Sequence, residues 1–412
     1  MDRPAFVVGA SWPGLGAIQS LRMKGVPCFA LDSRRSIGTH SRYASYQRIP
    51  DPRQDGQAMI ERIIDLARRS RHRPVVIPAD DHYAQALAAG RDDIEEVASV
   101  CVASADVVNL LIRKARFYEW AESEGLSCPA GVPAAEFGAG SALDFPIVVK
   151  SRRRALDIDF KDSNRFYLRF ELLRNAREWR EYCASHAAYL ADLLVQEFVP
   201  GTTADMYSIG IYADRQSQIR GLFVGRKIRG FPAIYGDTRA GQNDSVPGSV
   251  LAEVRYIVHR LGYCGIAEFE YKRDVKSGRF RLIEVNPRCW SWVGITTASL
   301  ADIPWIAYQD LIGSAPQPVT HNRDPGSIKY ARILWDLSDV LLRHRSGHRA
   351  WAMSPLQWWK SLRAEKLVAA EFTRNDWPVA LWSILFIIGS AFRLAWRQIG
   401  RASRLLIRPT AN

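Results

Sequence analysis

The sequence predicts an α/β fold, and three observations carry this prediction. Apolar strands alternate with helical patterns over residues 4–100, and strand pairs joined by polar turns follow up to Arg288. The chain of 412 residues is long enough for several domains with a sizeable core. Alternation of strands and helices is typical of a parallel sheet that binds ligands at the carboxyl ends of its strands.

The first region contains three strands separated by helical stretches. "AFVVGA" reads as a buried strand, and "SWPGLGAIQSLRMKG" follows it with turn glycines and a helical pattern. "VPCFALD" is a second strand that ends at Asp32, and "PVVIPAD" is a third that ends at Asp80. We therefore expect an α/β domain over residues 1–105.

The next elements are a helix, two strands and a first strand pair. The pattern predicts a helix over Asp106–Gly125, a strand over Phe145–Ser151 and a strand with a Pro-Gly turn over Leu193–Thr203. Two strands between Asp205 and Lys227 then flank a polar turn. A helix over Ser249–Gly262 precedes a hairpin, in which "GIAEFEYKRD" and "RFRLIEVNPR" are joined across "VKSG".

Composition indicates a globular protein of a reducing compartment. Hydrophobic residues make up 47% and charged residues 24% of the chain. Six scattered cysteines without a CxxC pair argue against a disulfide framework and against a structural zinc site. The N-terminus shows no signal-peptide pattern, so we expect a cytoplasmic protein.

The second hairpin carries the strongest functional signal. Because residues i, i+2 and i+4 of a strand share a face, Glu284, Asn286 and Arg288 are expected to point the same way. Glu270 lies on the partner strand, and Glu268 is a competing candidate on the same face. Carboxylate and amide oxygens suit a hard cation such as Mg²⁺. An exposed hairpin with polar residues placed by chance is the alternative.

Three further stretches allow a functional and a structural interpretation. Lys150 either marks a strand end or, with "KSRRR" after it, binds phosphate. "VQEFVPG" is either an ordinary strand and turn or a backbone surface for a flat heterocycle, with Glu197 and Asp205 near sugar hydroxyls. "GASWPGLG" lacks the strict G-x-G-x-x-G spacing, so a tight turn or a non-nucleotide substrate surface competes with dinucleotide binding.

Taken in order, these pieces resemble the ATP-grasp superfamily of ATP-dependent carboxylate–amine ligases. The resemblance is to the branch related to biotin carboxylase and the carbamoyl-phosphate synthetase large chain, and it covers roughly residues 5–315. It rests on "PIVVKS", on "VQEFVPG" followed by Asp205, and on "GIAEFEYKRD…GRFRLIEVNPRCW". It implies a Rossmann-like domain at 1–105, a small ATP-grasp subdomain at 106–192, a large one at 193–315 and a basic, Trp-rich helical extension at 316–412.

The resemblance also implies roles for individual residues. Lys150 would contact the phosphates of ATP, and Asp205 would face the ribose. Arg288 and Asn286 would act in catalysis, Arg288 by steadying the transferred phosphoryl group or the acyl phosphate. The metal, Mg²⁺ or Mn²⁺, would be held by Glu270, Glu284 and Asn286. The adenine hinge and the further phosphate contacts would be formed by Gln196, Glu197, Phe198, Val199, Arg226 and Lys227.

Two stretches depart from the family pattern or stay open. The phosphate-covering loop of the family is usually glycine-rich, whereas "RRRALDIDFKDSNRF" has no glycine, so Lys161 would have to replace the usual loop lysine. Trp290 and Trp292 follow Arg288 and belong either to the core or to the wall of the acceptor pocket.

The C-terminal region is basic and rich in tryptophan. From Gln317 onward, 15 Lys and Arg stand against 6 Asp and Glu, which gives this region +9 of the net charge of +13. The stretch Trp377–Phe392 carries no charge, but it is shorter than the ~20 residues of a membrane span. Five arginines then recur every three or four residues from Arg393 to Arg408. This pattern favours an interfacial helix on an anionic membrane, with a helix packed on the body or in a homodimer as the alternative.

The sequence therefore predicts a ligase that joins a small carboxylate to an amine through an acyl phosphate and releases ADP and phosphate. No nucleic-acid partner is expected, and the protein would be cytoplasmic or peripheral at the inner membrane face. One alternative is a catalytically degenerate ATP-grasp protein that acts as a binding or scaffold subunit. Another is an NAD(P)-dependent oxidoreductase that uses "GASWPGLG" and Asp32, which leaves the acidic hairpin without a role.

Overall fold

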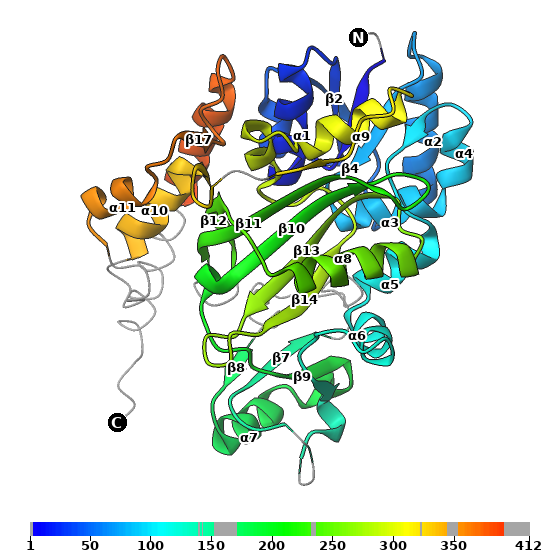
Figure 1. Cartoon of the computed structure of the whole chain (residues 1–412). Coiled ribbons are helices and arrows are strands. Elements are labelled where there is room, and N and C mark those ends of the chain that lie inside the picture. The colour runs from blue at the N-terminus through cyan, green and yellow to red at the C-terminus, as the bar shows by residue number, and fades with distance from the viewer. Residues whose placement is uncertain are drawn as a thin grey trace, which may run out of the picture.

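A computed structural model describes residues 3–138, 141, 143–151, 171–231, 236–321, 324–343 and 353–390. Their strands form three sheets, which lie one after another from the N-terminal region to the small sheet at the opposite end of the molecule (Figure 1). The stretch that corresponds to the phosphate-covering loop, with Lys161, lies outside the described residues.

The N-terminal sheet is parallel. Its strands are, in spatial order, β3 (Ala44–Arg48), β2 (Cys28–Asp32), β1 (Ala5–Val8), β4 (Val75–Pro78) and β5 (Ser99–Val100). The helices of this region are α1 (Trp12–Met23), η1 (Ile37–His40), α2 (Gly56–Arg68), α3 (Asp81–Ala89) and α4 (Arg91–Glu95). The central strands are continuous apolar runs because both faces of a parallel sheet are covered. The carboxyl ends of β1, β2 and β4 meet at one edge of the sheet.

The small sheet is antiparallel and follows two helices, α5 (Ala105–Ile112) and α6 (Lys114–Ser123). Its strands are, in spatial order, β6 (Gly131–Pro133), β9 (Leu193–Glu197), β7 (Ile147–Ser151) and β8 (Glu171–Leu173). Its helices are η2 (Ala134–Glu136), α7 (Ala176–Ser185) and η4 (Ala187–Asp192). Strand β9 lies between β6 and β7, so the expected division at residue 193 falls within this sheet.

The large sheet is mainly antiparallel. Its strands are, in spatial order, β14 (Phe280–Asn286), β13 (Gly265–Arg273), β10 (Met206–Ala213), β11 (Ile219–Phe231), β12 (Asp237–Asn243), β16 (Ile328–Ala331) and β17 (Lys366–Ala369), while β15 (Val319–Thr320) pairs with β11. Its helices are η5 (Thr203–Asp205), α8 (Gly248–Arg260), η6 (Val293–Ala298), α9 (Ile303–Leu311), α10 (Ile333–Arg343) and α11 (Pro355–Ser361).

The two faces of the large sheet have different neighbours. One face packs on the apolar side of α8, where Val254 and Ile257 are fully buried with Phe269 and Tyr271 of β13. On the other face, Trp290 and Trp292 pack in a core that also contains residues of β1 and α1. Both indoles are at most 1% exposed, so they belong to the core and do not line a pocket.

The C-terminal region is not purely helical, in contrast to the expectation. Strands β16 and β17 extend the large sheet, because residues 328–331 are largely buried and pair with β12. Helix α10 is fixed to the same sheet by Asp336, whose carboxylate accepts from the Arg229 guanidinium at 2.5 Å and from the indole of Trp358 at 2.7 Å. The described residues between 316 and 376 therefore continue the body of the molecule.

Residues 377–390 are helical and pack on the N-terminal region, and we call them the C-terminal segment. Val379 is fully buried in a cluster with Leu15 of α1 and Ile37 of η1. Just before this segment, Asp376 accepts hydrogen bonds from Ser41 Oγ at 2.7 Å and from the Arg42 amide at 2.8 Å. None of the helices among the described residues is both long and apolar enough to span a membrane.

Candidate active site

The polar residues of the β13–β14 hairpin gather on one face of the large sheet. Glu270 lies directly opposite Glu284, and Glu268 lies opposite Asn286. Ser208 of β10 is the register partner of Glu270 and lies on the same face. Residues directly opposite each other on antiparallel strands have neighbouring side chains. The hairpin therefore brings three carboxylates and one amide together.

A bulge in β14 makes this arrangement possible. Tyr271 pairs with Leu282 while Glu270 pairs with Glu284, so Ile283 is the extra residue. Without the bulge, Leu282 and Glu284 would share a face because side chains alternate along a strand. With it, Leu282 joins the apolar core under α8, and Glu284 joins the acidic face.

The hydrogen bonds distinguish the three carboxylates. Glu268 has both oxygens engaged, because Ser208 Oγ donates to Oε1 at 2.6 Å and Asn286 Nδ2 donates to Oε2 at 3.2 Å. Glu270 accepts from Lys227 Nζ at 2.9 Å. Glu284 accepts from Asn286 Nδ2 at 3.2 Å and lies 3.1 Å from Lys114 Nζ. Glu270 and Glu284 are thus held by cations, whereas Glu268 is held by neutral donors.

Burial and mutual repulsion make negative charge on this face unfavourable unless a cation compensates it. Burial, reinforced by the neighbouring Glu270, raises the pKa of Glu268 to about 8. Burial also raises the pKa of Glu270, and Glu284 adds to this effect, although Lys227 opposes it. Burial tends to lower the pKa of Lys227, but the carboxylates of Glu270 and Glu268 outweigh it and the net shift is upward. Such a face favours an added cation.

The donor set fits a hard divalent ion that also binds other ligands. Among the described residues, no group of three or more His, Cys, Asp or Glu side chains is arranged to hold a metal by itself. Two carboxylates and one amide oxygen suffice for Mg²⁺, which usually keeps several waters and phosphate oxygens as its remaining partners. The residues of this face therefore fit Mg²⁺ bound together with a phosphate.

Lys150 faces the hairpin from the small sheet. Its ammonium donates to Gln196 Oε1 at 2.5 Å and to the Tyr118 hydroxyl at 2.8 Å. Tyr118 in turn donates to the carbonyl of Ile283, the bulge residue of β14. Burial, followed by repulsion from Lys114, holds the pKa of Lys150 well below its usual range, while Glu284 opposes the shift. A buried lysine of this kind gains from an anionic partner.

The residues expected to border the adenine lie where the small sheet meets the large sheet. Glu197 ends β9, and its carboxylate lies 2.7 Å from the Arg281 guanidinium of β14. The Lys272 ammonium lies 5.0 Å from the centroid of the Phe198 ring, and Val199 is buried. A cavity of about 500 Å³ adjoins this strand end and is lined by Glu197, Phe198 and seven further residues.

Asp205 and Arg226 do not reach the acidic face. Asp205 closes the η5 turn by accepting from the Thr202 amide at 3.0 Å. Arg226 precedes Lys227 on β11, so the two side chains point to opposite faces of the sheet. The Arg226 guanidinium pairs with Asp244 at 2.6 Å on one face, whereas Lys227 contacts Glu270 on the other.

Arg288 connects the hairpin to the N-terminal sheet. Strand β14 ends at Asn286, and the Arg288 guanidinium donates to Asn286 Oδ1 at 3.0 Å. It also donates to both oxygens of Asp81 at 2.8 and 3.1 Å. Asp81 is the first residue of α3, directly after the carboxyl end of β4. These contacts fix the direction of the guanidinium beside the acidic face.

Comparisons with known proteins agree with this arrangement. The chain is 23% identical over 230 residues to the D-aspartate ligase of Enterococcus faecium (strain Aus0004), a match that covers 52% of this chain and 53% of that protein. The chain thus matches about half the length of this curated relative. The sequence matches no protein-family profile.

Three solved structures share the fold. One is the N5-carboxyaminoimidazole synthetase of Staphylococcus aureus in complex with ADP, with a TM-score of 0.60 at 14% identity. This match covers 84% of the present chain and 86% of the synthetase chain. The biotin carboxylase domain of Hydrogenobacter thermophilus 2-oxoglutarate carboxylase, a dimer with MgADP and bicarbonate, has a TM-score of 0.57 at 16% identity with coverages of 78% and 72%. The L-amino acid ligase of Bacillus licheniformis has a TM-score of 0.56 at 13% identity with coverages of 75% and 74%.

The chain has the ATP-grasp fold. The resemblance predicted from the sequence is thereby confirmed, and the acidic face corresponds to the hairpin on which that prediction rested. The residues that sequence reasoning missed are Tyr118, Asp81 and Ser208, which position Lys150, Arg288 and Glu268 respectively. Of these three, only Asp81 could have been found from the sequence, because it follows the carboxyl end of the predicted third strand, where ligands of a parallel sheet bind.

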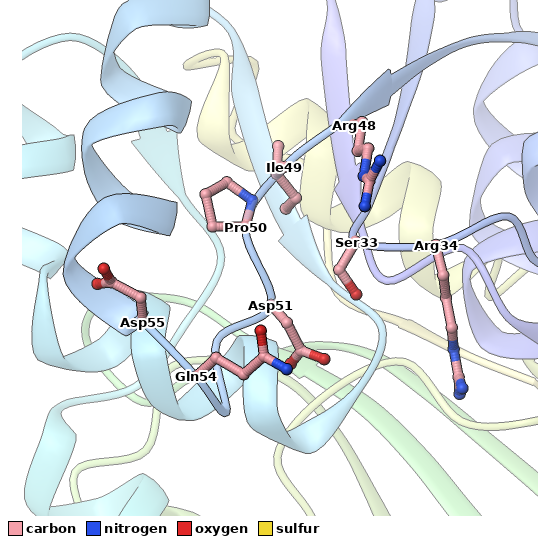
Figure 2. Close-up of a pocket in the computed structure, with 8 residues that line it drawn as sticks. All are labelled: Ser33, Arg34, Arg48, Ile49, Pro50, Asp51, Gln54 and Asp55. Atoms are coloured by element: carbon pink, nitrogen blue, oxygen red, sulfur yellow. The ribbon is translucent and has the colours of Figure 1, made fainter.

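The N-terminal part of the chain has a polar cleft of its own. A cavity of about 530 Å³ is lined by residues that include Arg34, Arg48 and Asp51, which Figure 2 labels. A second cavity shares Ser33, Arg34 and Asp51 with it and extends to Gly9 and Asp80 at the carboxyl ends of the strands. Both cations and carboxylates therefore line this cleft.

The glycine turn after β1 is closed by Asp32. Its carboxylate accepts from the Ala10 amide at 2.8 Å, from Ser36 Oγ at 2.9 Å and from the Tyr83 hydroxyl at 3.1 Å. A dinucleotide site would need the carboxylate at this strand end for ribose hydroxyls. Because three internal donors occupy Asp32, the structure favours a tight turn over nicotinamide binding.

Proposed function

We propose that this chain is an ATP-dependent carboxylate–amine ligase that forms an acyl phosphate and releases ADP and phosphate. The observation that carries the proposal is the acidic face formed by Glu270, Glu284 and Asn286, which is partly buried and which Lys150 faces from the small sheet through Tyr118. Its support is the ATP-grasp fold and the similarity to a D-aspartate ligase.

In this proposal ATP binds between the small and the large sheet. Gln196, Glu197, Phe198 and Val199 border the adenine, partly through backbone groups, and Asp205 lies near the ribose. The phosphates extend toward Lys150 and Lys227, whose buried ammonium groups gain an anionic partner. Arg226 has a smaller part here, since its guanidinium is engaged by Asp244 on the other face.

Glu270, Glu284 and Asn286 would hold Mg²⁺ or Mn²⁺ against the phosphates. When bound, the metal neutralises charge on the phosphoryl group and helps to orient it. The protein contributes the fixed positions of these oxygens, which the β14 bulge and the Asn286 hydrogen bonds define. Glu268, with both oxygens occupied, supports Asn286.

Arg288 is placed to act on the carboxylate substrate. A carboxylate is a poor electrophile, and transfer of the terminal phosphoryl group of ATP to its oxygen creates a good leaving group. The guanidinium, fixed by Asp81 and Asn286, would stabilise the acyl phosphate and the oxyanion formed when the amine attacks its carbonyl carbon. Phosphate then leaves, and no covalent protein nucleophile is required.

We further propose that the substrates are amino acids or related metabolites. Two of the similar proteins are named D-aspartate ligase and L-amino acid ligase. The cleft of the N-terminal part offers both arginines and aspartates, which suits a substrate that carries an ammonium and a carboxylate. Arg288 and Asp81 lie where this part meets the acidic face.

The test compares nucleotides first and substrates second. We expect ATP with Mg²⁺ to raise the melting temperature of the protein and NADH to leave it unchanged. Phosphate release is then measured with pooled D- and L-amino acids as carboxylates and amines. Stabilisation by NADH alone would refute the ligase proposal. ATP binding without ADP formation across the pool would instead favour a scaffold protein.

A further inference from the structure

Exposed large apolar side chains concentrate in the C-terminal part of the molecule. Among the described residues, four of them precede residue 316, namely Met23, Tyr256, Val275 and Leu300. Eleven follow it, namely Leu341, Leu356, Trp359, Leu367, Phe372, Trp377, Leu381, Ile384, Leu385, Phe386 and Ile388. A soluble surface normally scatters such residues, and their concentration marks an interaction site.

Five of these residues form a stripe along the C-terminal segment. Trp377, Leu381, Ile384, Leu385 and Ile388 are spaced by four, three, one and three positions, so they share one face of the helix. Their exposed fractions range from 41% to 60%. We call these five residues the apolar stripe.

The opposite side of the same helix is fixed to the body. Val379 and Ser383 are fully buried, and the Trp382 ring stacks on His40 of η1 at a centroid distance of 5.6 Å. Phe386 stacks on Trp335 of α10 at 5.2 Å. The segment is therefore held in place with its apolar stripe turned outward, close to β17 and α10 at the end of the chain that Figure 1 draws in orange and red.

The charge around the stripe identifies its partner. Among the described residues 353–390, four cations are exposed, namely Lys360, Arg363, Lys366 and Arg374, against one exposed acid, Glu365, whereas Glu371 and Asp376 are fully buried. In the sequence, the segment is followed by five arginines, Arg393, Arg397, Arg401, Arg404 and Arg408, and by no acidic residue. An exposed apolar helix face in a part of the chain with an excess of cations complements an anionic lipid surface, where the rings and aliphatic chains enter the headgroup boundary.

We propose that the apolar stripe docks on the surface of an anionic lipid bilayer, with the helix lying in the interface. The stripe covers one side of its helix only, which suits a helix that lies along the surface. Trp377 stands at the start of the stripe, and tryptophan is favoured at the boundary between headgroups and acyl chains. A second copy of the chain is a poorer occupant, because its approach would bring two cationic surfaces together.

The test uses co-sedimentation of the full chain with vesicles of mixed phosphatidylcholine and phosphatidylglycerol, and with vesicles of pure phosphatidylcholine. We expect binding to the mixed vesicles and weak binding to the neutral ones. The double variant Leu385→Asp/Ile388→Asp should bind the mixed vesicles at least about tenfold more weakly, because both side chains must leave water on docking. Point variants are preferable to truncation after Arg374, since truncation removes Asp376 from its bonds to Ser41 and Arg42.

The matched control is Met23→Asp/Val275→Asp, which exchanges two exposed apolar residues for the same charges outside the C-terminal part. It should bind the mixed vesicles like the wild type. Circular dichroism and melting curves establish that each variant is folded. Equal vesicle binding by Leu385→Asp/Ile388→Asp and the wild type would overturn the proposal. So would self-association of the wild type, lost in that variant, without any binding to vesicles, because the stripe would then be a contact between copies.

Discussion

The buried pair of Arg229 and Asp336 offers a direct test of how the C-terminal part is attached. Both side chains are at most 3% exposed, and the guanidinium donates to the carboxylate over distances of 2.5 to 3.2 Å. The Trp358 indole donates to the same carboxylate. Removal of one partner from a buried pair costs about 3–5 kcal/mol, because the other charge stays buried without compensation.

We therefore expect Asp336→Ala to lower the free energy of unfolding by about 3–5 kcal/mol. The variant leaves Arg229 with the hydroxyl of Ser361 as its remaining side-chain acceptor. The double variant Arg229→Met/Asp336→Leu should lose much less, since it removes both charges and refills the space with apolar groups. The Trp358 indole still loses its acceptor in the double variant, which costs about 1–3 kcal/mol.

The assay is urea unfolding followed by circular dichroism and tryptophan fluorescence. The control is Asp65→Ala, which breaks solvent-accessible pairs with Arg62 and Arg69 and should change stability by less than about 1 kcal/mol. If Asp336→Ala costs no more than Asp65→Ala, the pair does not hold α10 and α11 to the sheet. A double variant as unstable as the single one would show that packing, and not the uncompensated charge, dominates.

Three further predictions concern the site, the core and pH. Glu284→Gln should abolish ATP-dependent phosphate release while the circular dichroism spectrum stays unchanged; near-normal rates would move the metal site elsewhere. Gly210→Ala should destabilise the fold by at least about 1–3 kcal/mol, since its Cβ would lie 2.1 Å from the Trp290 ring, whereas Gly248→Ala, in open space, is the control. Burial raises the pKa of Glu371 to about 7 from an ordinary value of 4.5. Ionisation of this acid therefore leaves the free energy of unfolding unchanged below pH 4.5, lowers it progressively as pH rises to 7, and lowers it by about 3 kcal/mol above pH 7. In urea unfolding, Glu371→Gln should therefore have the same free energy of unfolding as the wild type at low pH and a higher one above pH 7. A difference that does not change with pH would contradict the raised pKa of Glu371.

The strand pattern made the fold and the acidic hairpin predictable. Glu270, Glu284 and Asn286 stand on facing strands with a polar turn between them, and this local pairing needs no knowledge of distant contacts. The bulge at Ile283 was not predictable, because nothing in "RLIEVN" shows which of two apolar residues is extra. The structure explains how Leu282 and Glu284 separate to opposite faces.

The other features that the sequence did not predict depend on contacts between residues far apart in the chain. Arg226 and Lys227 are equally basic, and only the register of β11 shows that Lys227 meets Glu270. Strands β16 and β17 have four residues each, too few for a clear period, and they form because β12 presents an edge to them. The partner of Arg288 is Asp81, which lies more than two hundred positions earlier and leaves no trace near the hairpin.

The contacts of the last described residues also set the order in which the chain can complete its folding. Gln19 of α1 donates to the carbonyl of Ala370, and Ser41 and Arg42 donate to Asp376. During synthesis the N-terminal sheet leaves the ribosome long before these partners exist, so helix α1 and the η1 turn complete their contacts only when the end of the chain has been made. The first region to emerge is thus among the last to be finished, and a chain halted before residue 370 would present an incomplete N-terminal domain to chaperones and proteases.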